Sequence, residues 1–279
     1  MMRIAVVVTT YNRPDALAAV LAGYAAQEDR DFELVIADDG STGETGKLVE
    51  AFRARLSVPL QHVWQEDRGF RAAAARNRAV AATSAEYVIF TDGDCVPARG
   101  FVAAHRRLAR QGYFLGGNRV LLGEALTRRV LAEGLPTHAW SWRQWLRAWA
   151  ARDVNRLLPL LRLPDSAALR TRQPQRWYGV KTCNLSLWRS DFVRVNGLDE
   201  QYDGWGLEDS DLVIRLLHAG VRHKSARFAA PVFHLWHPEN PRHNLERNQA
   251  RLDQVLRSRE YRAARGLEQA IARGEVDIG

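Results

Sequence analysis

The sequence contains little cysteine, almost no lysine and no long apolar run. Its two cysteines, Cys95 and Cys183, lie far apart in the chain and form neither a CxxC pair nor a disulfide framework, so we expect both to be small buried core residues. The apolar stretch at residues 4–8 runs directly into polar residues and is far too short for a signal peptide or a membrane-spanning helix. We therefore expect a protein that stays in the cytoplasm.

Two common nucleotide-binding motifs are missing as well. No GxGxxG follows the first predicted strand and no GxxxxGK[ST] occurs in the chain, which argues against dinucleotide-dependent oxidoreductases and P-loop nucleotide hydrolases. With 46% hydrophobic and 26% charged residues over 279 positions, the chain can bury a sizeable core, and it is neither disordered nor fibrous. One or two domains are expected at this length.

The excess of positive charge is concentrated in one segment. There are 40 Lys+Arg against 32 Asp+Glu, a formal net charge of +8, and residues 125–177 alone hold ten arginines and three acids. Only three of the basic residues are lysines, and the arginine guanidinium suits bidentate contacts with phosphate. A nucleic-acid-binding surface is one interpretation of this basic segment, and a general bias of the genome toward arginine is another.

Strand and helix patterns alternate through the first half of the chain. Residues 3–9 form a continuous apolar, β-branched run, which is typical of a strand buried on both faces. The alternation predicts βαβ units and a mostly parallel sheet. Further strands are predicted at residues 32–37, 60–64, 87–91, 113–117 and within 180–188, and helices from residue 14 and near 45–55, 71–82, 101–111, 208–218 and in the C-terminal tail.

Polar residues follow three of the predicted strands. They are residues 9–13 after the first strand, two aspartates at 38–39 after the second, and an Asp-Gly-Asp turn at 92–94 after the fourth. Because ligands bind beyond the carboxyl ends of parallel strands, we expect these segments to converge on one crevice. The Asp-Gly-Asp carboxylates suit a hard divalent cation, and the glycine permits close approach of a ligand. The aspartates at 38–39 either cap the next helix or accept a hydrogen bond from a nucleobase or ribose.

A second acidic group occurs at residues 204–211 (GWGLEDSD), where the predicted helix 208–218 begins. The helix macrodipole explains acids in a first turn, but a glycine-flanked tryptophan leading into Glu-Asp also suits a sugar face beside a general base, and we favour this second interpretation. His234 and His237 form an HxxH pair that can complete the coordination of a metal held by the Asp-Gly-Asp turn. Spacing alone does not decide which histidine binds.

The basic segment also contains an aromatic helix. Trp142, Trp145 and Trp149 are predicted to share one helical face, while Arg143 and Arg147 line another. One interpretation is a helix packed on the domain. The other is a surface for anionic lipid or for a phosphate-bearing acceptor.

Five segments and the HxxH pair together resemble a known family. In this order they resemble the family-2 inverting glycosyltransferases of GT-A fold, and the C-terminal half is similar to the galactosyltransferase-type module that carries GWGxEDxD. The resemblance runs from about residue 3 to 240 and leaves out most of 125–177 and the tail. The segments are VVVTTYNRPDAL, ELVIADDGSTGET, GFRAAAARNRAV, YVIFTDGDCVP and VKTCNLSLWRSDFVRVNGLDEQYDGWGLEDSDLVIRLLHAG.

This resemblance implies an α/β fold of GT-A type, with a mostly parallel, Rossmann-like sheet flanked by helices. Residues 1–120 would be the nucleotide-sugar-binding half and residues 179–240 the acceptor and catalytic half. Between them lies a basic, Trp-rich helical insertion at 121–178, and a helical extension follows at 241–279.

Roles on the donor side are implied position by position. Thr9 and Tyr11 would hold the nucleobase, the tyrosine by stacking. Asp39 would accept a hydrogen bond from the uracil N–H, while Asp38 supports the turn. The other donor-binding positions are Arg13, Arg76, Asp92, at the ribose or donor sugar, and Gly93.

The resemblance also implies a metal and an acceptor side. Asp94 would bind Mn²⁺ or Mg²⁺ at the diphosphate together with His237. His234 takes the place of a neighbouring ligand that is often not a histidine. The acceptor-side residues are Trp205, Glu208 and Asp209, the last as the catalytic base.

The implied enzyme is a metal-dependent inverting hexosyltransferase. It would take a UDP-sugar of the galactose, N-acetylgalactosamine or N-acetylglucosamine type and act on a hydroxyl of a cell-envelope glycan, such as lipopolysaccharide or capsule, or of a lipid-linked acceptor. The basic insertion would then lie against the inner membrane, and no nucleic-acid partner is expected. The alternative is a basic nucleic-acid- or glycan-binding protein without catalysis, and nucleic-acid binding does not explain the acids at three strand ends.

Overall fold

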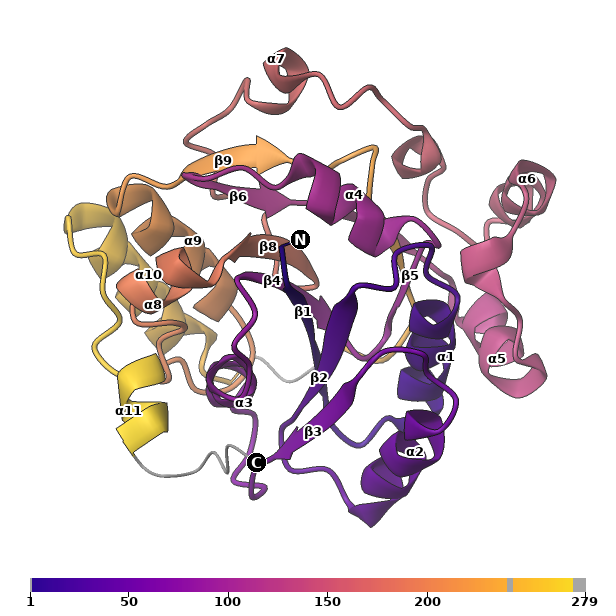
Figure 1. The fold of residues 1–279 in the computed structure, drawn as a ribbon, viewed down its shortest axis with the longest axis horizontal. Helices are drawn as coiled ribbons and strands as arrows, with labels where there is room; N and C mark the ends of the chain where they lie inside the picture. The colour runs from indigo at the N-terminus through magenta and orange to yellow at the C-terminus, as the bar shows by residue number, and fades with distance from the viewer. Residues whose placement is uncertain (1, 240–242, 273–279) are drawn as a thin grey trace.

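A seven-stranded sheet runs through the centre of the computed structural model, which describes residues 2–239 and 243–272 (Figure 1). Its order is β3-β2-β1-β4-β8-β6-β9; β8 is antiparallel to both neighbours and all other pairs are parallel. The mostly parallel α/β sheet expected from the sequence is therefore confirmed. The strands are β1 (Ile4–Thr10), β2 (Phe32–Asp38), β3 (Leu60–Trp64), β4 (Tyr87–Asp92), β6 (Tyr113–Gly116), β8 (Asn184–Trp188) and β9 (Arg222–Ser225).

Helices cover both faces of this sheet, and each face has its own apolar core. The core on one face includes side chains of α1 (Pro14–Ala25), α2 (Gly43–Arg53) and α4 (Phe101–Leu108). The core on the other face includes side chains of α3 (Ala72–Ala81), α8 (Arg189–Arg194), α9 (Glu208–His218) and α11 (Leu267–Ala272).

The alternation of side chains along β1 explains its unbroken apolar sequence. Val6 and Val8 point into the first core, whereas Ala5 and Val7 point into the second, and all four are fully buried. A strand covered on both faces has no solvent side on which polar residues are favoured. Polar residues are therefore displaced to its carboxyl end.

A second, three-stranded sheet was not expected from the sequence. It has the order β5-β10-β7, formed by β5 (Cys95–Pro97), β10 (Pro231–His234) and β7 (Asn118–Leu121). In the antiparallel register of β10 with β5, His234 lies opposite Cys95. This pairing carries the HxxH segment to the Asp-Gly-Asp turn, which lies more than 130 residues earlier in the chain.

The basic insertion consists of short helices and connecting turns on one side of the molecule (Figure 1). The three tryptophans that were predicted to share one helical face of α6 differ in burial. Trp145 is 4% exposed, with its ring centroid 4.5 Å from that of Phe233, whereas Trp142 and Trp149 are about half exposed. At 3.6 residues per turn the three side chains lie within about 60° of one another around the helix, with Trp145 at the border that faces the core. The elements are α5 (Glu124–Glu133), η1 (Thr137–Ala139), α6 (Trp142–Ala150), η2 (Leu158–Leu160) and α7 (Ala167–Arg170).

The expected helical tail forms α10 (Leu245–Arg257) and α11, while the part of that expectation at residues 273–279 lies outside the described residues. Among the helices of the described residues, none combines the length and the apolar character that a bilayer crossing requires. Both cysteines are buried, as expected.

The contrast between the tryptophans of α6 gives a test of the packing. Replacing Trp145 with Ala removes a buried indole from the core and should lower the free energy of unfolding by about 3–5 kcal/mol. The matched variant Trp149→Ala, at a half-exposed site of the same helix, should stay within about 0.5 kcal/mol of the wild type. Urea unfolding followed by circular dichroism measures both, and equal losses would contradict the assignment of Trp145 to the core.

Candidate functional site

Three parallel strands bring the expected polar residues together at the carboxyl end of the sheet. Thr9 of β1 lies opposite Asp92 of β4, and Thr10 of β1 lies opposite Asp38 of β2. The backbone N–H of Asp39 donates to the Thr10 carbonyl at 3.0 Å. Segments that the sequence places after separate strands are thus neighbours in space.

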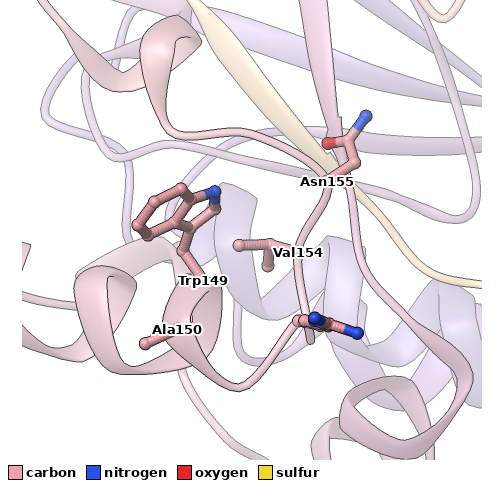
Figure 2. Close-up of a pocket in the computed structure, with 5 residues that line it drawn as sticks. Trp149, Ala150, Val154 and Asn155 are labelled. Carbon is pink, nitrogen blue, oxygen red and sulfur yellow. The ribbon is translucent and has the colours of Figure 1, made fainter.

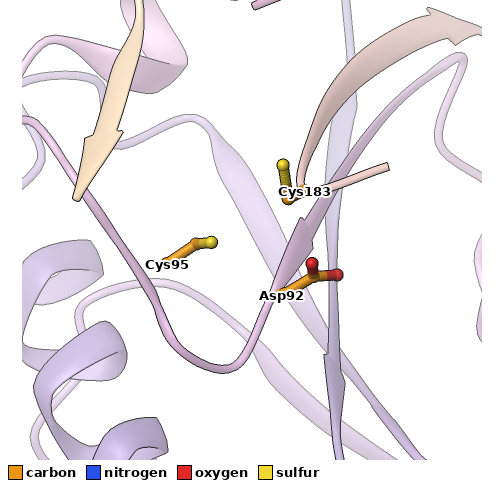
Figure 3. A group of neighbouring side chains, drawn as sticks. All are labelled: Asp92, Cys95 and Cys183. Atoms are coloured by element: carbon orange, nitrogen blue, oxygen red, sulfur yellow. The ribbon is translucent and has the colours of Figure 1, made fainter. Parts of the chain in front are cut away.

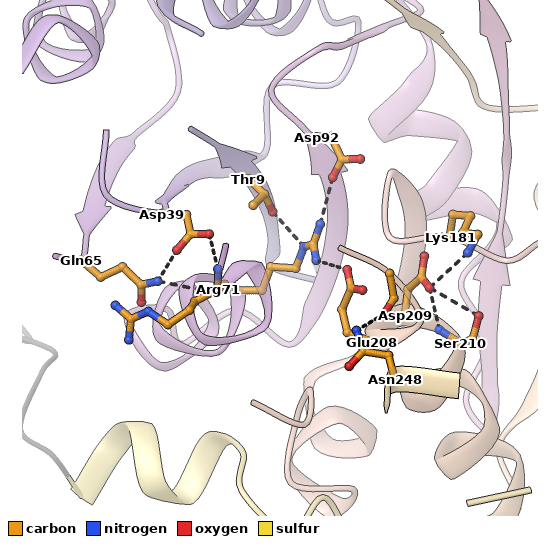
Figure 4. A network of polar contacts seen from close by, with 12 residues as sticks. Thr9, Asp39, Gln65, Arg71, Asp92, Lys181, Glu208, Asp209, Ser210 and Asn248 are labelled. Carbon is orange, nitrogen blue, oxygen red and sulfur yellow. Dashed lines mark hydrogen bonds and ion pairs between the residues drawn. The ribbon is translucent and has the colours of Figure 1, made fainter. Parts of the chain in front are cut away.

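Arg76 on α3 is the centre of a buried polar network. Its Nε donates to Thr9 Oγ1 at 2.9 Å, and its terminal nitrogens contact Asp92 Oδ1 and Glu208 Oε1, each at 3.1 Å. Figure 4 shows Thr9 and Asp92 at the strand ends and Glu208 at the start of α9, with this network between them. The guanidinium therefore joins the first half of the chain to the acidic helix of the second half.

Carboxylates outnumber cations around this guanidinium. Burial raises the pKa of Glu208, the charge of Asp209 adds to the rise, and Arg76 opposes it. Burial also raises the pKa of Asp92 against the opposing charge of Arg76, and the charge of Asp94 adds to the rise. Three cations, Arg76, Arg119 and Lys181, act on these four carboxylates, and the small excess of negative charge suits a further cation or a proton.

The two aspartates after β2 have different partners. Asp38 Oδ1 accepts the backbone N–H of Ser41 at 2.8 Å, so this side chain supports the turn. Asp39 instead accepts the backbone N–H of Arg71 at 2.7 Å and a side-chain N–H of Gln65. Burial raises the pKa of Asp39 to about 6, although those two hydrogen bonds oppose the rise. At neutral pH this carboxylate is mostly ionised and acts as an acceptor.

The loop after β1 presents an aromatic ring. Asn12 has a left-handed backbone (φ 47°), a conformation that asparagine tolerates better than most residues. Tyr11 is 48% exposed, and its hydroxyl donates to Asp67 Oδ2 at 2.9 Å. The Nε of Arg13 contacts Asp15 at 3.0 Å. A half-exposed ring held by its hydroxyl is suited to stacking against a flat ligand.

Asp94 and the two histidines form a cluster with the ligand types of a metal site. One ligand atom from each lies within 4.8 Å of the others, and Asp94 Oδ2 is 3.2 Å from His237 Nε2 and 3.6 Å from His234 Nε2. Burial lowers the pKa of His234, whereas the hydrogen bond to Asp94 raises the pKa of His237. Burial opposes ionisation of Asp94, but the hydrogen bond of His237 and the charge of both histidines hold its pKa below the usual range.

The Asp-Gly-Asp turn lies against two thiols. Asp92, Cys95 and Cys183 have ligand atoms within 4.8 Å of one another (Figure 3). Cys95 Sγ donates to Asp94 Oδ1 at 3.3 Å. Burial raises the pKa of Cys95 well above its ordinary value, which favours the protonated thiol. A Cβ added to Gly93 would come within 3.0 Å of a threonine hydroxyl on β1. The turn is therefore tightly packed, and its proximity to both cysteines was not predicted.

A loop with a left-handed backbone leads into α9. Both of its glycines have positive φ, and so does Leu207 (φ 79°), which is a strained conformation for leucine. Asn248 of α10 is fully buried, and its Nδ2 donates at 3.1 Å to the carbonyls of Asp203 and Gly206, on both sides of Trp205. The C-terminal extension thus holds the loop, a role that sequence reasoning missed because the resemblance ends before it.

Asp209 follows this loop and has a basic neighbour that was also missed. Its side chain is almost fully buried, with Oδ1 3.3 Å from Lys181 Nζ and 2.7 Å from the backbone N of Ser210 (Figure 4). Trp205, at the centre of the loop, is 36% exposed. Lys181 is one of three lysines in an arginine-rich chain, and that rarity was the only signal for it.

Two sequence families match the chain. The family described as "Glycosyl transferase family 2" matches residues 5–172, which is more than half of the sequence. The family described as "N-terminal domain of galactosyltransferase" matches residues 165–238, which include the loop before α9 and both histidines. The two matches cover the parts of the chain that carry the Arg76 network.

Curated relatives are glycosyltransferases. Validoxylamine A glucosyltransferase of Streptomyces hygroscopicus subsp. jinggangensis is 34% identical over 227 residues, which cover 78% of this chain and 52% of the relative. Chondroitin synthase of Escherichia coli is 24% identical over 261 residues, covering 88% of this chain and 36% of the relative. The chain spans about half the length of the first of these relatives and less of the second.

Solved structures show the same fold at low sequence identity. S. aureus TarS 1–349 in complex with UDP has a TM-score of 0.62 at 14% identity, covering 96% of this chain and 68% of TarS. The mannosyltransferase PcManGT from Pyrobaculum calidifontis, in complex with GDP-Man and Mn²⁺, has a TM-score of 0.58 at 20% identity, covering 92% and 64%. The expected GT-A fold is confirmed.

The network around Arg76 predicts a pH-dependent loss of stability. In Arg76→Met, Glu208 and Asp92 lose their shared cation, and the free energy of unfolding near pH 8 should fall by about 3–5 kcal/mol. Without that charge the raised pKa values of both acids rise further, so the folded state binds more protons than the unfolded state and the loss should shrink as pH falls.

Denaturant unfolding of this variant at pH 8 and pH 5.5 measures the effect. Arg68→Met, which removes the partner of Glu66 in an exposed ion pair, is the control and should change stability by less than about 0.5 kcal/mol at either pH. A loss for Arg76→Met that is the same at both pH values would contradict the role of the two buried acids.

Proposed function

The chain belongs to glycosyl transferase family 2 and is a glycosyltransferase, and we propose that it transfers a hexose from a UDP-sugar to a hydroxyl group with inversion at the sugar carbon. The observation that carries this proposal is the Arg76 network, which joins the strand ends to Glu208 through two contacts of 3.1 Å. A donor held at the strand ends and an acceptor held at α9 would then meet across one buried guanidinium.

For the donor, we propose that residues 1–120 bind the nucleotide, with Tyr11 stacked on the base and Asp39 accepting from the uracil N–H. The half-exposed ring of Tyr11 and the ionised state of Asp39 at neutral pH support these roles. Thr9 and Arg13 border the same loop, and Asp92 would contact the ribose or donor sugar. The UDP and UDP-GlcNAc complexes of TarS support a UDP donor, and the sugar is proposed to be of the galactose, N-acetylgalactosamine or N-acetylglucosamine type.

One group of metal-binding side chains in the protein fits a divalent cation. Asp94, His234 and His237 offer one carboxylate and two imidazoles within 4.8 Å, and the lowered pKa of His234 favours the neutral form that binds metals. Mn²⁺ or Mg²⁺ bound there would neutralise the charge of the departing nucleoside diphosphate. The Mn²⁺ in the PcManGT structure supports this choice of ion.

On the acceptor side, which we assign to residues 179–240, Asp209 is the proposed base. An inverting transfer needs a base on the face opposite the leaving group, and Asp209 lies beside Trp205, whose partly exposed ring suits a sugar face. Asp209 would take the proton of the acceptor hydroxyl, and Glu208 would accept a hydrogen bond from another acceptor hydroxyl. Lys181 Nζ lies 3.3 Å from Asp209 Oδ1 and would orient this carboxylate.

We also propose that the enzyme acts at the cytoplasmic surface of the inner membrane, on a cell-envelope glycan or a lipid-linked saccharide. On α6, Trp142, Leu146 and Trp149 are each at least 40% exposed, and Arg143 and Arg147 are exposed beside them. Trp149 also lines a cavity of about 470 Å³, together with Ala150, Val154 and Asn155 (Figure 2). An anionic bilayer fits this surface better than a nucleic acid does. The headgroup region would pair with the arginines and would also cover the exposed aromatic and aliphatic groups.

Two substitutions separate the proposed base from the proposed metal ligand. Asp209→Asn should reduce turnover by about 10²–10⁴-fold while leaving UDP affinity unchanged, because it removes only the proton acceptor. Asp94→Ala should lose both the Mn²⁺-dependent part of UDP binding and turnover. Calorimetry with UDP, with and without Mn²⁺, and a sugar-transfer assay measure these effects.

Asp31→Asn is the control for both variants. Asp31 lies at the amino end of β2, away from the strand ends that carry the site, so this variant should behave as the wild type. Retention of most of the turnover by Asp209→Asn would remove the base role from Asp209.

The membrane surface makes a separate prediction. Vesicles of phosphatidylcholine with phosphatidylglycerol should bind the protein, whereas phosphatidylcholine alone should bind it weakly, because the arginines require anionic headgroups. The double variant with Trp142→Ser and Trp149→Ser should bind the anionic vesicles at least about tenfold more weakly than the wild type, because two half-exposed indoles are lost from the interface. Leu256→Ser on α10 is the control and should leave sedimentation with vesicles unchanged, and equal binding to both vesicle types would contradict the proposal.

A further inference from the structure

A cleft lined by four arginines lies between α3, α10 and the chain before Trp205. Its volume is about 370 Å³, in the size range of small-molecule sites. The arginines come from three distant segments: Arg71 at the start of α3, Arg247 and Arg251 on α10, and Arg265 before α11. Convergence of like charges from separate elements is repulsive unless an anion compensates it.

The acids of the cleft do not compensate all of this charge. Glu200 is almost fully buried and contacts Arg265 at 3.6 Å, while it also accepts from Asn77 at 3.2 Å. Asp203 accepts from an asparagine side chain at 3.3 Å. Two acids against four arginines leave the lining with an excess of two positive charges.

Two of the arginines also have a buried donor with no hydrogen-bond partner. The Nε atoms of Arg71 and Arg251 are both buried from solvent and make no hydrogen bond within the described part of the chain. Their terminal nitrogens are engaged at one point each, with the Glu66 carbonyl and with the side chain of Gln201, at 2.7 Å. Buried donors without acceptors are costly, and they add to the unmatched positive charge around the cleft.

The cleft is connected to the loop that precedes the proposed base. Asp203 lines it, and Trp205 follows two residues later. Asn248, between two of the arginines on α10, holds this loop on both sides through its side-chain N–H groups. A group bound in the cleft would therefore lie beside the loop that carries Trp205.

We propose that this arginine cleft binds a carboxylate or phosphate group carried by the acceptor glycan, next to the unit that receives the hexose. The inference rests on the proposed transfer to a glycan acceptor. Arginine forks match the planar oxygens of both anions, and the cavity accommodates one charged saccharide or alditol phosphate unit. The site would thereby select an acidic acceptor over a neutral one of the same length.

The test compares three oligomers of equal length in binding to the full chain: a glucuronate-containing hyaluronan tetrasaccharide, a ribitol-phosphate tetramer and neutral chitotetraose. Inorganic phosphate is a fourth probe. Wild-type protein should bind at least one of the two acidic oligomers about tenfold or more tightly than chitotetraose, as expected for added charge-assisted hydrogen bonds. The glucuronate and phosphate arms identify which anion the cleft takes.

The single variant Arg247→Gln should weaken that preference for acidic oligomers. The double variant, which adds Arg251→Gln, should lose it more completely. Arg257→Gln, at an exposed position on the same helix and outside the cleft, should keep it. Unfolding curves for all variants separate a lost site from a lost fold, because Arg247 is exposed and its replacement should not destabilise the protein.

Equal affinity of wild type for all three oligomers would overturn the proposal, and so would a preference that survives in the double variant. Inorganic phosphate binding without any preference among the oligomers would also overturn it, because the cleft would then be a site for a free anion. UDP binding by the wild type is measured alongside. If UDP fails to bind, the proposed donor is wrong, whereas normal UDP binding with no oligomer preference rejects the arginine cleft alone.

Discussion

The buried guanidinium of Arg76 is the interaction on which the site depends. A cation taken out of water must be paired, and its two carboxylate partners, Asp92 and Glu208, come from opposite halves of the chain. The alanine-rich helix α3 carries it between the sheet and α9, because small side chains let the helix pack closely. This pairing therefore joins the proposed donor side to the proposed acceptor side, and loss of the cation would leave two acids without their shared partner.

A second constraint comes from the backbone before α9. The positive φ of Leu207 is unfavourable for a leucine, so the surrounding contacts must hold it, and Asn248 from the C-terminal extension supplies two of them. This strain aims the first turn of α9, with Asp209, toward the Arg76 network. The extension thus supports the loop that leads into the proposed catalytic residues, and the arginine cleft that it forms with α3 would extend the proposed acceptor site beyond the sugar that reacts.

The fold was largely predictable because local patterns decide it. Buried β-branched runs predicted the parallel strands, and the polar residues at their ends do lie side by side, as expected. What remained hidden depends on contacts between distant segments: the small sheet that brings His234 to Cys95, the packing of Cys183 against Asp92, and the approach of Lys181 to the proposed base. No local pattern carries such pairings, since they follow from how the second half of the chain packs on the first. The burial of Trp145 was not predicted either, because a stripe of aromatic residues does not reveal which of them faces the core.

We propose that a cation site and a proton acceptor serve one reaction in this chain, and the most direct test is crystallographic. A crystal of the protein grown with UDP and Mn²⁺ should show an anomalous scattering peak bonded to Asp94 and at least one of the two histidines, with the diphosphate of UDP on the same ion and the uracil against Asp39. An ion bound elsewhere, or a nucleotide that lies outside the edge formed by the ends of β1, β2 and β4, would contradict the account.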